Sequence, residues 1–451
     1  MERIITEIAE KYIKNLLELM TNGGNINEIE VSALSEAKKC AAQIVGLYAE
    51  KVDAVIAKDK AARKKTGHTV ERRGDVRRLQ TLVGEVSYER TYYKKTSGEY
   101  EYLADTVLGV EKQQRISDGL SLSLVRAAKD MSYGKASNHI TAGEISRQTV
   151  MGKVRQSVAE EWVAEHRRRV PELHIDADEA HITLRGGKKS EVPLISIYEG
   201  IEAKGKRNSC KNVFHISEYG KTPDDLWEQT LTEIERRYDL AGTRIYIHGD
   251  GAKWIQTGFE WIPNAIFVLD KYHKNKAIKG MTAGMAPADR KLYDNVIRES
   301  LADGDIRFFK ELTQSLCNQL TERAEKIIGN ANYLEHFVSG ISVCEKDNSA
   351  NNGGCTEPHV SHVLSARLSS RPMAWSKRTL KKLAPVLAAG NARIQAKQTA
   401  KELPAPLRKV AVSANKAFRR GAAGLPNPTV IGTLPLTGKV TGTQKLLKLY
   451  A

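Results

Sequence analysis

Residues 244–273 contain one pattern twice, a short apolar run that leads into an acidic residue. The run IYI (245–247) leads into HGDG, and the run AIFVL (265–269) leads into DKYH. Short apolar runs bounded by glycine and polar residues indicate buried strands, and α/β sheets bind ligands at the carboxyl ends of their strands. We therefore expect Asp250, Asp270 and His273 to form a site at one edge of a sheet. A single acid at such a turn more often only caps a helix, so the choice between a site and a cap depends on the other acids of the chain.

A further strand is expected at LHIDADE (173–179), which carries three acids in four positions. Asp176 and Asp178 face the same side of that strand because side chains alternate. Burying two carboxylates on one face is costly unless a cation neutralises them, which favours a metal site. Two more apolar strands (192–197 and 213–216) and a helix from Thr222 precede the strand that ends at Asp250. This order is typical of an α/β ribonuclease-H-like core.

The net charge points to a polyanionic partner. The chain has 451 residues, enough for two to four domains, and a formal charge of +16. Such a charge favours nucleic acid or an anionic membrane surface. No apolar run reaches the roughly 18 to 20 residues of a membrane span, and the amino terminus is a charged amphipathic helix without a signal-peptide core. We therefore expect a cytoplasmic protein that binds nucleic acid and no membrane.

The five cysteines form no CxxC pair, so reduced thiols are expected rather than a disulfide framework. Cys355, His359 and His362 have a spacing that could contribute to a zinc site, but a fourth ligand is not evident from the sequence. Buried free cysteines more often serve as small apolar groups. The sequence therefore favours packing over zinc at Cys355.

The first 165 residues divide into three regions. Residues 1–70 have a helical apolar period that suits packing or oligomerisation, and residues 71–112 alternate like a β-hairpin that turns at Ser97-Gly98. Tyrosines of the hairpin could stack on nucleic acid, but packing is their commoner role. Residues 113–165 have the spacing of a helix-turn-helix DNA-binding domain, whose third helix buries Val150, Val154 and Val158. The side chains of that helix expected to face DNA are Arg147, Gln148, Thr149, Lys153 and Gln156.

Helical periodicity returns over residues 283–344 and predicts a block that interrupts the α/β core. After it, a helix that opens at Thr356 carries Glu357 in its first turn. An acid at that place more often only complements the helix dipole. Residues 391–451 form a tail rich in Lys, Arg, Ala, Gly and Pro, which we interpret as a basic arm able to lie along phosphates.

Four motifs together resemble the Lre-type insertion-sequence transposases, a prokaryotic group in the Mutator-like part of the DDE transposase superfamily. They are ADEAH (177–181), IHGDGAKWI (247–255), DKYH (270–273) and HVSHVLSARLSSRPMAWS (359–376). The resemblance implies DNA-binding modules followed by a ribonuclease-H-like catalytic core with an all-helical insertion. On this basis the first part of the core spans 170–282, the insertion 283–344, and the part with the final catalytic helix 345–390.

The same resemblance implies the catalytic residues. The first acid falls on Asp178, with Asp176 as the alternative, the second on Asp250 and the third on Glu357. These three would bind Mg²⁺ or Mn²⁺, and Asp270 and His273 would support the site or contact DNA. One residue separates Cys355 from Glu357, where the family pattern has two.

The implied function is that of a DDE transposase of a prokaryotic insertion sequence. It would bind the terminal inverted repeats and the target as double-stranded DNA, cut and join strands at the bound metal, act as a homo-oligomer and stay with the nucleoid. The altered spacing before Glu357 supports an alternative, a sequence-specific DNA-binding protein with a catalytically silent core. A third interpretation is a ribonuclease-H-like nuclease that cuts without joining.

Overall fold

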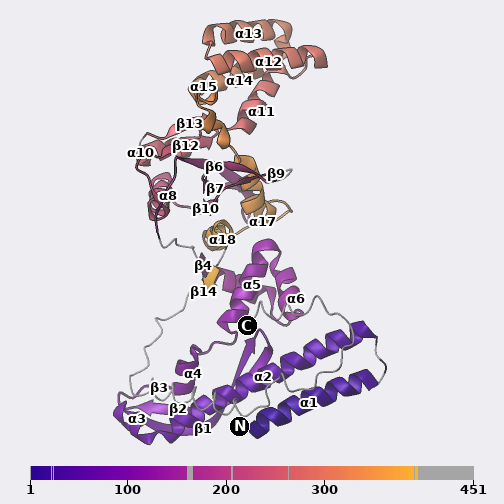
Figure 1. Ribbon diagram of the computed structural model, residues 1–451, viewed down its shortest axis with the longest axis vertical. Helices are drawn as coiled ribbons and strands as arrows, with labels where there is room; N and C mark the ends of the chain where they lie inside the picture. The colour runs from indigo at the N-terminus through magenta and orange to yellow at the C-terminus, as the bar shows by residue number, and fades with distance from the viewer. Residues whose placement is uncertain are drawn as a thin grey trace, which may run out of the picture. The chain divides into compact units, whose positions relative to one another are not determined.

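The computed structural model describes residues 2–21, 23, 25–159, 166–204, 207–262, 264–390 and 392–394. They fall into two compact units, the first ending at Leu120 and the second beginning at Ser121 (Figure 1). The basic tail expected over 391–451 lies outside the described residues, apart from 392–394, and so does the end of the expected helix-turn-helix domain at 160–165.

Helices and a three-stranded antiparallel sheet make up the first unit. Its elements are α1 (Glu2–Thr21), α2 (Ile26–Lys58), α3 (Lys60–Lys65), β1 (His68–Thr81), β2 (Gly84–Lys95), β3 (Tyr100–Glu101) and α4 (Leu103–Leu108). Helix α2 starts at a capping box. The Asn25 side chain accepts from the N–H groups of Asn27 and Glu28, and the Glu28 carboxylate accepts from the Asn25 N–H. The helix packs on β2, where Val52 and Ile56 meet the buried ring of Tyr93.

The hairpin differs from the expected one in the place of its main turn. Strands β1 and β2 pair along most of their length and turn at residues 82–83, while the turn at Ser97-Gly98 joins β2 to the short β3. Gly84, with φ of +103°, lets the chain re-enter the ladder directly after the first turn. Tyr88 and Tyr93 are buried and Tyr92 stacks on Tyr100, so these tyrosines pack within the unit, as the sequence favoured.

Three helices open the second unit: α5 (Asp118–Asp130), which begins three residues before the boundary, α6 (Tyr133–Thr141) and α7 (Arg147–Gln156). Ser132 and Ser146 cap α6 and α7 by accepting from backbone N–H groups in their first turns. Helix α7 is shorter than the apolar spacing predicted. It ends at Gln156, and Val158 lies in β4 (Ser157–Ala159), because that segment pairs with β14 (Ala392–Ile394) from the far end of the described chain.

A five-stranded mixed sheet with the order β10-β7-β6-β12-β13 forms the centre of the second unit. Its strands are β6 (Glu172–Thr183), β7 (Lys189–Tyr198), β10 (Phe214–Ile216), β12 (Arg244–Gly249) and β13 (Ile266–Leu269). Strand β7 is antiparallel to β6 and β10 is antiparallel to β7, whereas β6, β12 and β13 run parallel to one another.

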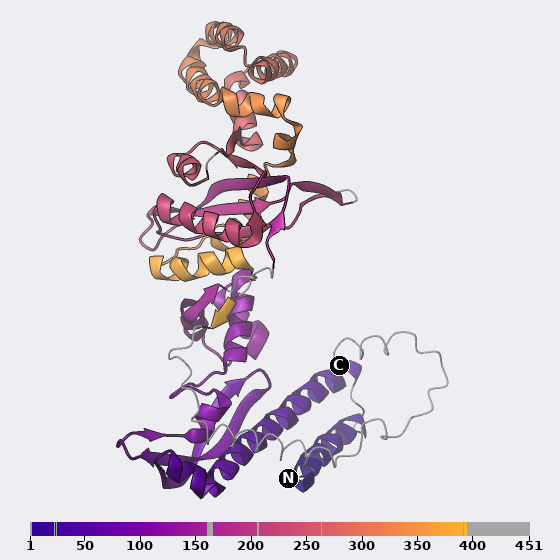
Figure 2. The ribbon, with the colours of Figure 1, turned by 60° about the vertical axis from the view of Figure 1, so that its left-hand side comes forward.

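The two faces of this sheet differ in chemistry because side chains alternate along each strand. One face is apolar and packs against α8 (Pro223–Arg237), which lies along the sheet (Figure 2). Trp227 of α8 is fully buried in the same cluster as Ile175, Ile197 and Ile247. The other face carries His174, Asp176 and other polar or aromatic groups. The elements that lie over this polar face are η2 (Asn348–Asn352), α16 (Thr356–His359) and the π-helical turn η3 (Val360–Ser365).

A block of helices follows β13 (Figures 1 and 2) and packs around a hydrophobic core that includes Leu269 of β13. It contains α11 (Lys271–Thr282), α12 (Pro287–Asp303), α13 (Ile306–Gln319), η1 (Thr321–Arg323), α14 (Ala324–His336) and α15 (Val338–Lys346). Helix α15 packs on β13. The block therefore joins the sheet at its parallel edge.

The remaining elements are α9 (Lys253–Gln256), α10 (Gly258–Trp261), α17 (Ala366–Leu368), α18 (Lys377–Ala389) and the strand pairs β5 (Arg168–Arg169) with β11 (Tyr238–Asp239) and β8 (Ile201–Lys204) with β9 (Arg207–Cys210). The buried guanidinium of Arg367 donates to the Ala128 carbonyl at 2.8 Å and lies over the Trp375 ring. It thereby ties α17 to α5. No helix in the described part of the chain has both the length and the apolar composition of a membrane span.

Candidate functional site

Three aspartates occupy equivalent places on the three parallel strands. His248 of β12 is paired with Asp176 of β6, and Gly249 is paired with Leu269 of β13. Continuing both registers past the last paired residues aligns Asp178 with Asp250 and Asp250 with Asp270. Adjacent strands are about 4.8 Å apart, so the register places the three carboxylates in one row at the carboxyl edge of the sheet.

Asp178 and Asp250 interact electrostatically. Burial raises the pKa of the Asp178 carboxyl to about 6, and the charges of Glu179 and Asp250 act in the same direction, against a hydrogen bond from the Glu179 N–H and the charge of His273. Burial also raises the pKa of Glu179, which accepts from the Trp254 indole at 2.8 Å. A cation would relieve the cost of these neighbouring negative charges.

Asp270 and His273 form a pair at the start of α11. Asp270 caps the helix by accepting from the N–H groups of Tyr272 and His273, and the His273 Nδ1 lies 3.2 Å from its Oδ1. Burial alone would raise the pKa of Asp270, but these hydrogen bonds keep it below the ordinary value. The Asp270 bond in turn raises the pKa of His273, as do the charges of Asp178 and Asp250. These interactions stabilise the protonated form of His273 relative to a free imidazole.

The loop after β12 leaves no room for a side chain. Gly251 has φ of +86°, and a Cβ atom there would overlap the ring of Phe337. Next to it, the hydroxyl of Tyr333 in α14 donates to the Asp250 carbonyl at 2.8 Å. The helical block thus fixes the backbone that carries Asp250.

Asp176 is engaged in a different, buried network, which separates it from Asp178. It is 1% exposed, and it accepts from the Tyr198 hydroxyl at 3.0 and 3.1 Å and from the Cys355 N–H at 2.9 Å. The Nδ1 atom of His359 lies 3.3 Å from the same carboxylate. The oxygen atoms of Asp176 thus already accept hydrogen bonds from Tyr198 and Cys355. We therefore regard Asp178 as the better candidate for the first acid of the row.

A group of histidines and cysteines adjoins Asp176. His174 Nδ1 lies 3.0 Å from His248 Nε2, and Gly353 approaches both rings so closely that a Cβ atom there would overlap them. Burial lowers the pKa of His248 to about 4, which keeps its ring neutral. The thiol of Cys210 donates a hydrogen bond to the thiol of Cys355, and this hydrogen bond lowers the pKa of Cys355 to about 7.

Glu357 lies on α16, outside the strands that carry the aspartates. It is exposed in the first turn of α16, while its neighbour Thr356 is buried beside Asp270. Within the described residues, no three His, Cys, Asp or Glu side chains are arranged ready to hold a metal ion. The structure therefore brings together Asp178, Asp250 and the Asp270–His273 pair, and it leaves Glu357 exposed on α16, which packs on β6.

The expected DNA-reading residues of α7 differ in exposure. Arg147 and Gln148 are exposed in the first turn, whereas Thr149, Lys153 and Gln156 are only half-exposed. The hydroxyl of Thr149 lies 3.0 Å from Ser146 Oγ in the helix cap. The freely accessible part of this predicted surface is thus its amino-terminal turn.

Sequence reasoning missed two groups of the second unit. Glu179 could have been predicted from the sequence, because it directly follows the expected catalytic acid Asp178 in ADEAH. Cys210 and His215 gave no usable signal, because they become neighbours of Cys355 and His359 only through the fold. Cys210 Sγ lies 3.5 Å from His359 Nε2.

Comparison with known proteins gives the family. Residues 19–402 match the family described as "Uncharacterised protein family (UPF0236)". Two UPF0236 proteins of Caldanaerobacter subterraneus subsp. tengcongensis are 35% and 36% identical to this chain over 381 and 392 residues. These matches cover 83% and 85% of this chain and 81% and 82% of the relatives. A UPF0236 protein of Streptococcus gallolyticus, named for its place in the vanSb 3′ region, is 25% identical over 76% of this chain and 79% of its own length.

These matches correct the family assignment drawn from the four motifs. The relatives carry the UPF0236 name, and none of them indicates a transposase family, so assignment to the Lre-type insertion-sequence transposases is wrong. The short motifs cover few residues, whereas the UPF0236 match extends over most of the chain. The protein belongs to the UPF0236 family.

Proposed function

We propose that this protein is a metal-dependent DNA transposase that binds the ends of its own element and catalyses strand cleavage and strand transfer. The observation that carries the proposal is the parallel pairing of β6 with β12, which ends two residues before Asp178 and Asp250, together with the effect of the Asp250 charge on the pKa of Asp178. The sheet order β10-β7-β6-β12-β13 supports a ribonuclease-H-like core. The helical block after β13 and the α5–α7 helices, with α7 as the recognition helix of a helix-turn-helix, support the proposed architecture.

The donor set fits Mg²⁺ or Mn²⁺. Mg²⁺ prefers hard oxygen ligands and is commonly held by one or two carboxylates, with water and substrate phosphate completing its coordination. Asp178 and Asp250 would be the protein ligands, and Glu357 would be the third acid on the segment that packs over β6. When bound, the metal would activate the attacking oxygen and stabilise the leaving one.

The chain's own residues would position the DNA. His273, whose pKa is raised by its hydrogen bond with Asp270, would contact a phosphate beside the carboxylates. Arg147 and Gln148 would contact the terminal repeat through the major groove, and the charge of +16 would favour double-stranded DNA in general. In the same proposal, the protein acts as a homo-oligomer in a prokaryotic cytoplasm, where it associates with the nucleoid.

The name of one relative adds independent support. The printed name combines eleven protein designations from a single strain, and the name of another relative from that strain combines four. A protein encoded at many places in one genome is the expected product of an element that copies or moves itself.

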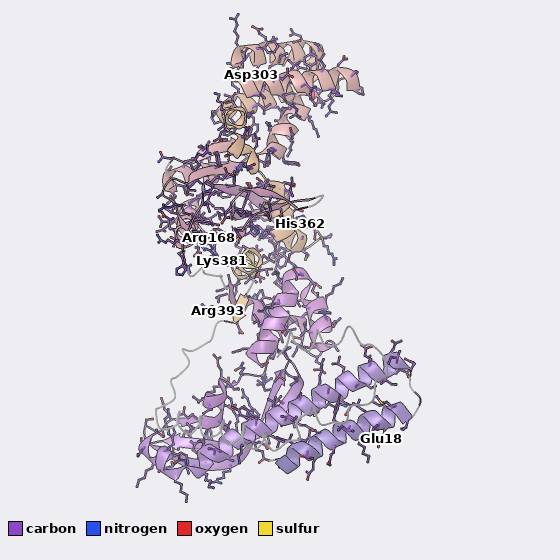
Figure 3. The ribbon with its side chains drawn as sticks, in the orientation of Figure 1. Glu18, Arg168, Asp303, His362, Lys381 and Arg393 are labelled. Carbon is purple, nitrogen blue, oxygen red and sulfur yellow. The ribbon has the colours of Figure 1, made fainter. Side chains whose placement is uncertain are left out.

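Strand joining by the purified protein tests the proposal. We would incubate it with labelled duplexes from the DNA that flanks its own gene, with Mg²⁺ or with EDTA. We expect nicked and joined products in Mg²⁺ only, and neither product from Asp178→Asn or Asp250→Asn protein that still binds the duplex. The matched control is Asp303→Asn, at an exposed acid in the helical block (labelled in Figure 3), which should keep both activities.

The exposure of Glu357 favours a second candidate function, a sequence-specific DNA-binding protein with a silent core. That function predicts tight, specific binding that does not depend on the metal, without nicked or joined products. A protein that nicks but never joins would instead be a nuclease. If Glu357→Gln protein joins DNA as well as the unchanged protein, Glu357 is not the third acid.

A further inference from the structure

Two cysteines and two histidines meet where the edge of the sheet approaches α16. Cys210 ends β9, His215 lies in β10, Cys355 precedes α16 and His359 ends it. The Cys210 Sγ is 3.5 Å from the His359 Nε2, and the thiols of Cys210 and Cys355 are hydrogen-bonded. The rings of His215 and His359 meet edge to face with centroids 5.2 Å apart. Four side chains of the types that bind zinc therefore share one place in the fold.

The spacing of these atoms suits a tetrahedral zinc ion. Zinc binds thiolate sulfur at about 2.3 Å and imidazole nitrogen at about 2.0–2.1 Å, so two such ligands of one tetrahedral ion lie about 3.5 Å apart. That is the distance between Cys210 Sγ and His359 Nε2.

A hydrogen bond with Ser196 orients the His215 ring, and the buried Asp176 carboxylate lies beside His359 Nδ1 without hydrogen-bond geometry. The Asp176 carboxylate lies 3.3 Å from His359 Nδ1, and the Ser196 hydroxyl lies 2.8 Å from His215 Nδ1. Asp176 and Ser196 are each 1% exposed. Zinc-binding histidines commonly bond through their other ring nitrogen to a carboxylate or another polar group, which leaves one nitrogen for the metal. Here the Nε2 atoms remain as the candidate ligands.

We propose that Cys210, His215, Cys355 and His359 bind one Zn²⁺ ion. The ligands form two short pairs in the sequence, Cys-x4-His in β9–β10 and Cys-x3-His at α16. On binding, two thiols would release their protons to solvent, and metal bonds would replace the thiol–thiol and thiol–imidazole hydrogen bonds. Within the described residues no three of these side chains are already arranged as ligands, so metal binding would require them to change rotamer.

The ion would have a structural role distinct from the carboxylate row. It would join the β9–β10 segment to the residues 355–359 and so hold the first turn of α16, with Thr356 and Glu357, over the polar face of the sheet. Structural zinc sites with four protein ligands contribute folding free energy directly. The inference does not depend on the proposed transposase function.

Metal analysis of the full-length protein tests the inference. Protein produced in zinc-supplemented medium and dialysed without chelator should contain about one zinc per chain by elemental mass spectrometry. Cys210→Ser, His215→Ala, Cys355→Ser and His359→Ala should each remove most of this zinc. The matched controls are His362→Ala, an exposed histidine three residues beyond His359 (labelled in Figure 3), and Cys40→Ser in α2, which should both retain it.

A measurement on the unchanged protein avoids any folding defect of the variants. Replacement of zinc by Co²⁺ should give the visible absorption of a tetrahedral ion and the near-ultraviolet charge transfer of thiolate ligands. Absence of bound metal after reconstitution with ZnCl₂ would overturn the inference, and so would a disulfide between Cys210 and Cys355 in the purified protein. Asp178→Asn protein should lose strand joining but keep its zinc. The zinc inference and the proposed transposase function can therefore fail independently of each other.

Discussion

At the scale of single residues, Gly251 shows how closely the helical block adjoins the carboxylate row. Its positive φ and the adjacent ring of Phe337 both exclude a side chain, and the residue before it is Asp250. The left-handed conformation alone costs a non-glycine residue about 1–2 kcal/mol. Overlap with a packed ring adds about 1–3 kcal/mol, because an aromatic side chain in a packed core has little room to move.

We predict that Gly251→Ala lowers the free energy of unfolding by about 3 kcal/mol. The control is Gly242→Ala, since Gly242 has φ of +78° with no atom within 4 Å of an added Cβ, and it should lose only about 1–2 kcal/mol. Urea denaturation would measure both changes. Adding Phe337→Ala to Gly251→Ala should increase the loss by less than Phe337→Ala costs alone, because it removes the overlap; a fully additive double variant would contradict the proposed overlap.

At the scale of elements, α7 illustrates how tertiary pairing limits a helix. The apolar spacing of Val150, Val154 and Val158 suggested a third buried turn, but pairing of β4 with β14 ends the helix at Gln156. The other end of α7 is capped by Ser146 and leaves Arg147 and Gln148 exposed. If α7 binds DNA, its amino-terminal turn is the part that reaches it.

We predict that Arg147→Ala with Gln148→Ala weakens binding to the DNA that flanks the gene by about 10- to 100-fold, as loss of base or phosphate contacts does. Arg307→Ala in α13 removes an equally exposed positive charge outside α7 and should change the affinity little. Fluorescence anisotropy at two salt concentrations would measure both. Equal losses in the two proteins would mean that only net charge matters.

At the scale of the whole molecule, both units contain hydrophobic clusters among the described residues. Val52, Ile56 and Tyr93 belong to a cluster of the first unit, while the core around Trp227 and that of the helical block belong to the second. A unit with its own buried core has the main requirement for independent folding.

We predict that a fragment of residues 117–394 unfolds cooperatively on heating. A fragment that ends at residue 346 keeps the sheet, α8 and the helical block but lacks the segment over the polar face, so Asp176 and His174 would lose their cover. It should unfold at a lower temperature and with less cooperativity. Circular dichroism would measure both transitions, and equal midpoints would show that the segment 347–394 contributes nothing to stability.

Local sequence patterns determined the strands and their acids. An apolar run needs burial wherever it lies, so β12 and β13 were predictable, and with them the delivery of Asp250 and Asp270 to strand ends. Alternation also placed Asp176 and Asp178 on one side of β6. These features depend on residues within a few positions of one another.

Only the tertiary structure decided how these pieces meet. Strand register aligned Asp178 with Asp250, and contact with Cys355 assigned Asp176 to a different network. The same fold brought Cys210 within 3.5 Å of a histidine 149 residues away. Such proximities arise from strand pairing and packing between distant segments, and a single sequence carries no local pattern that specifies them.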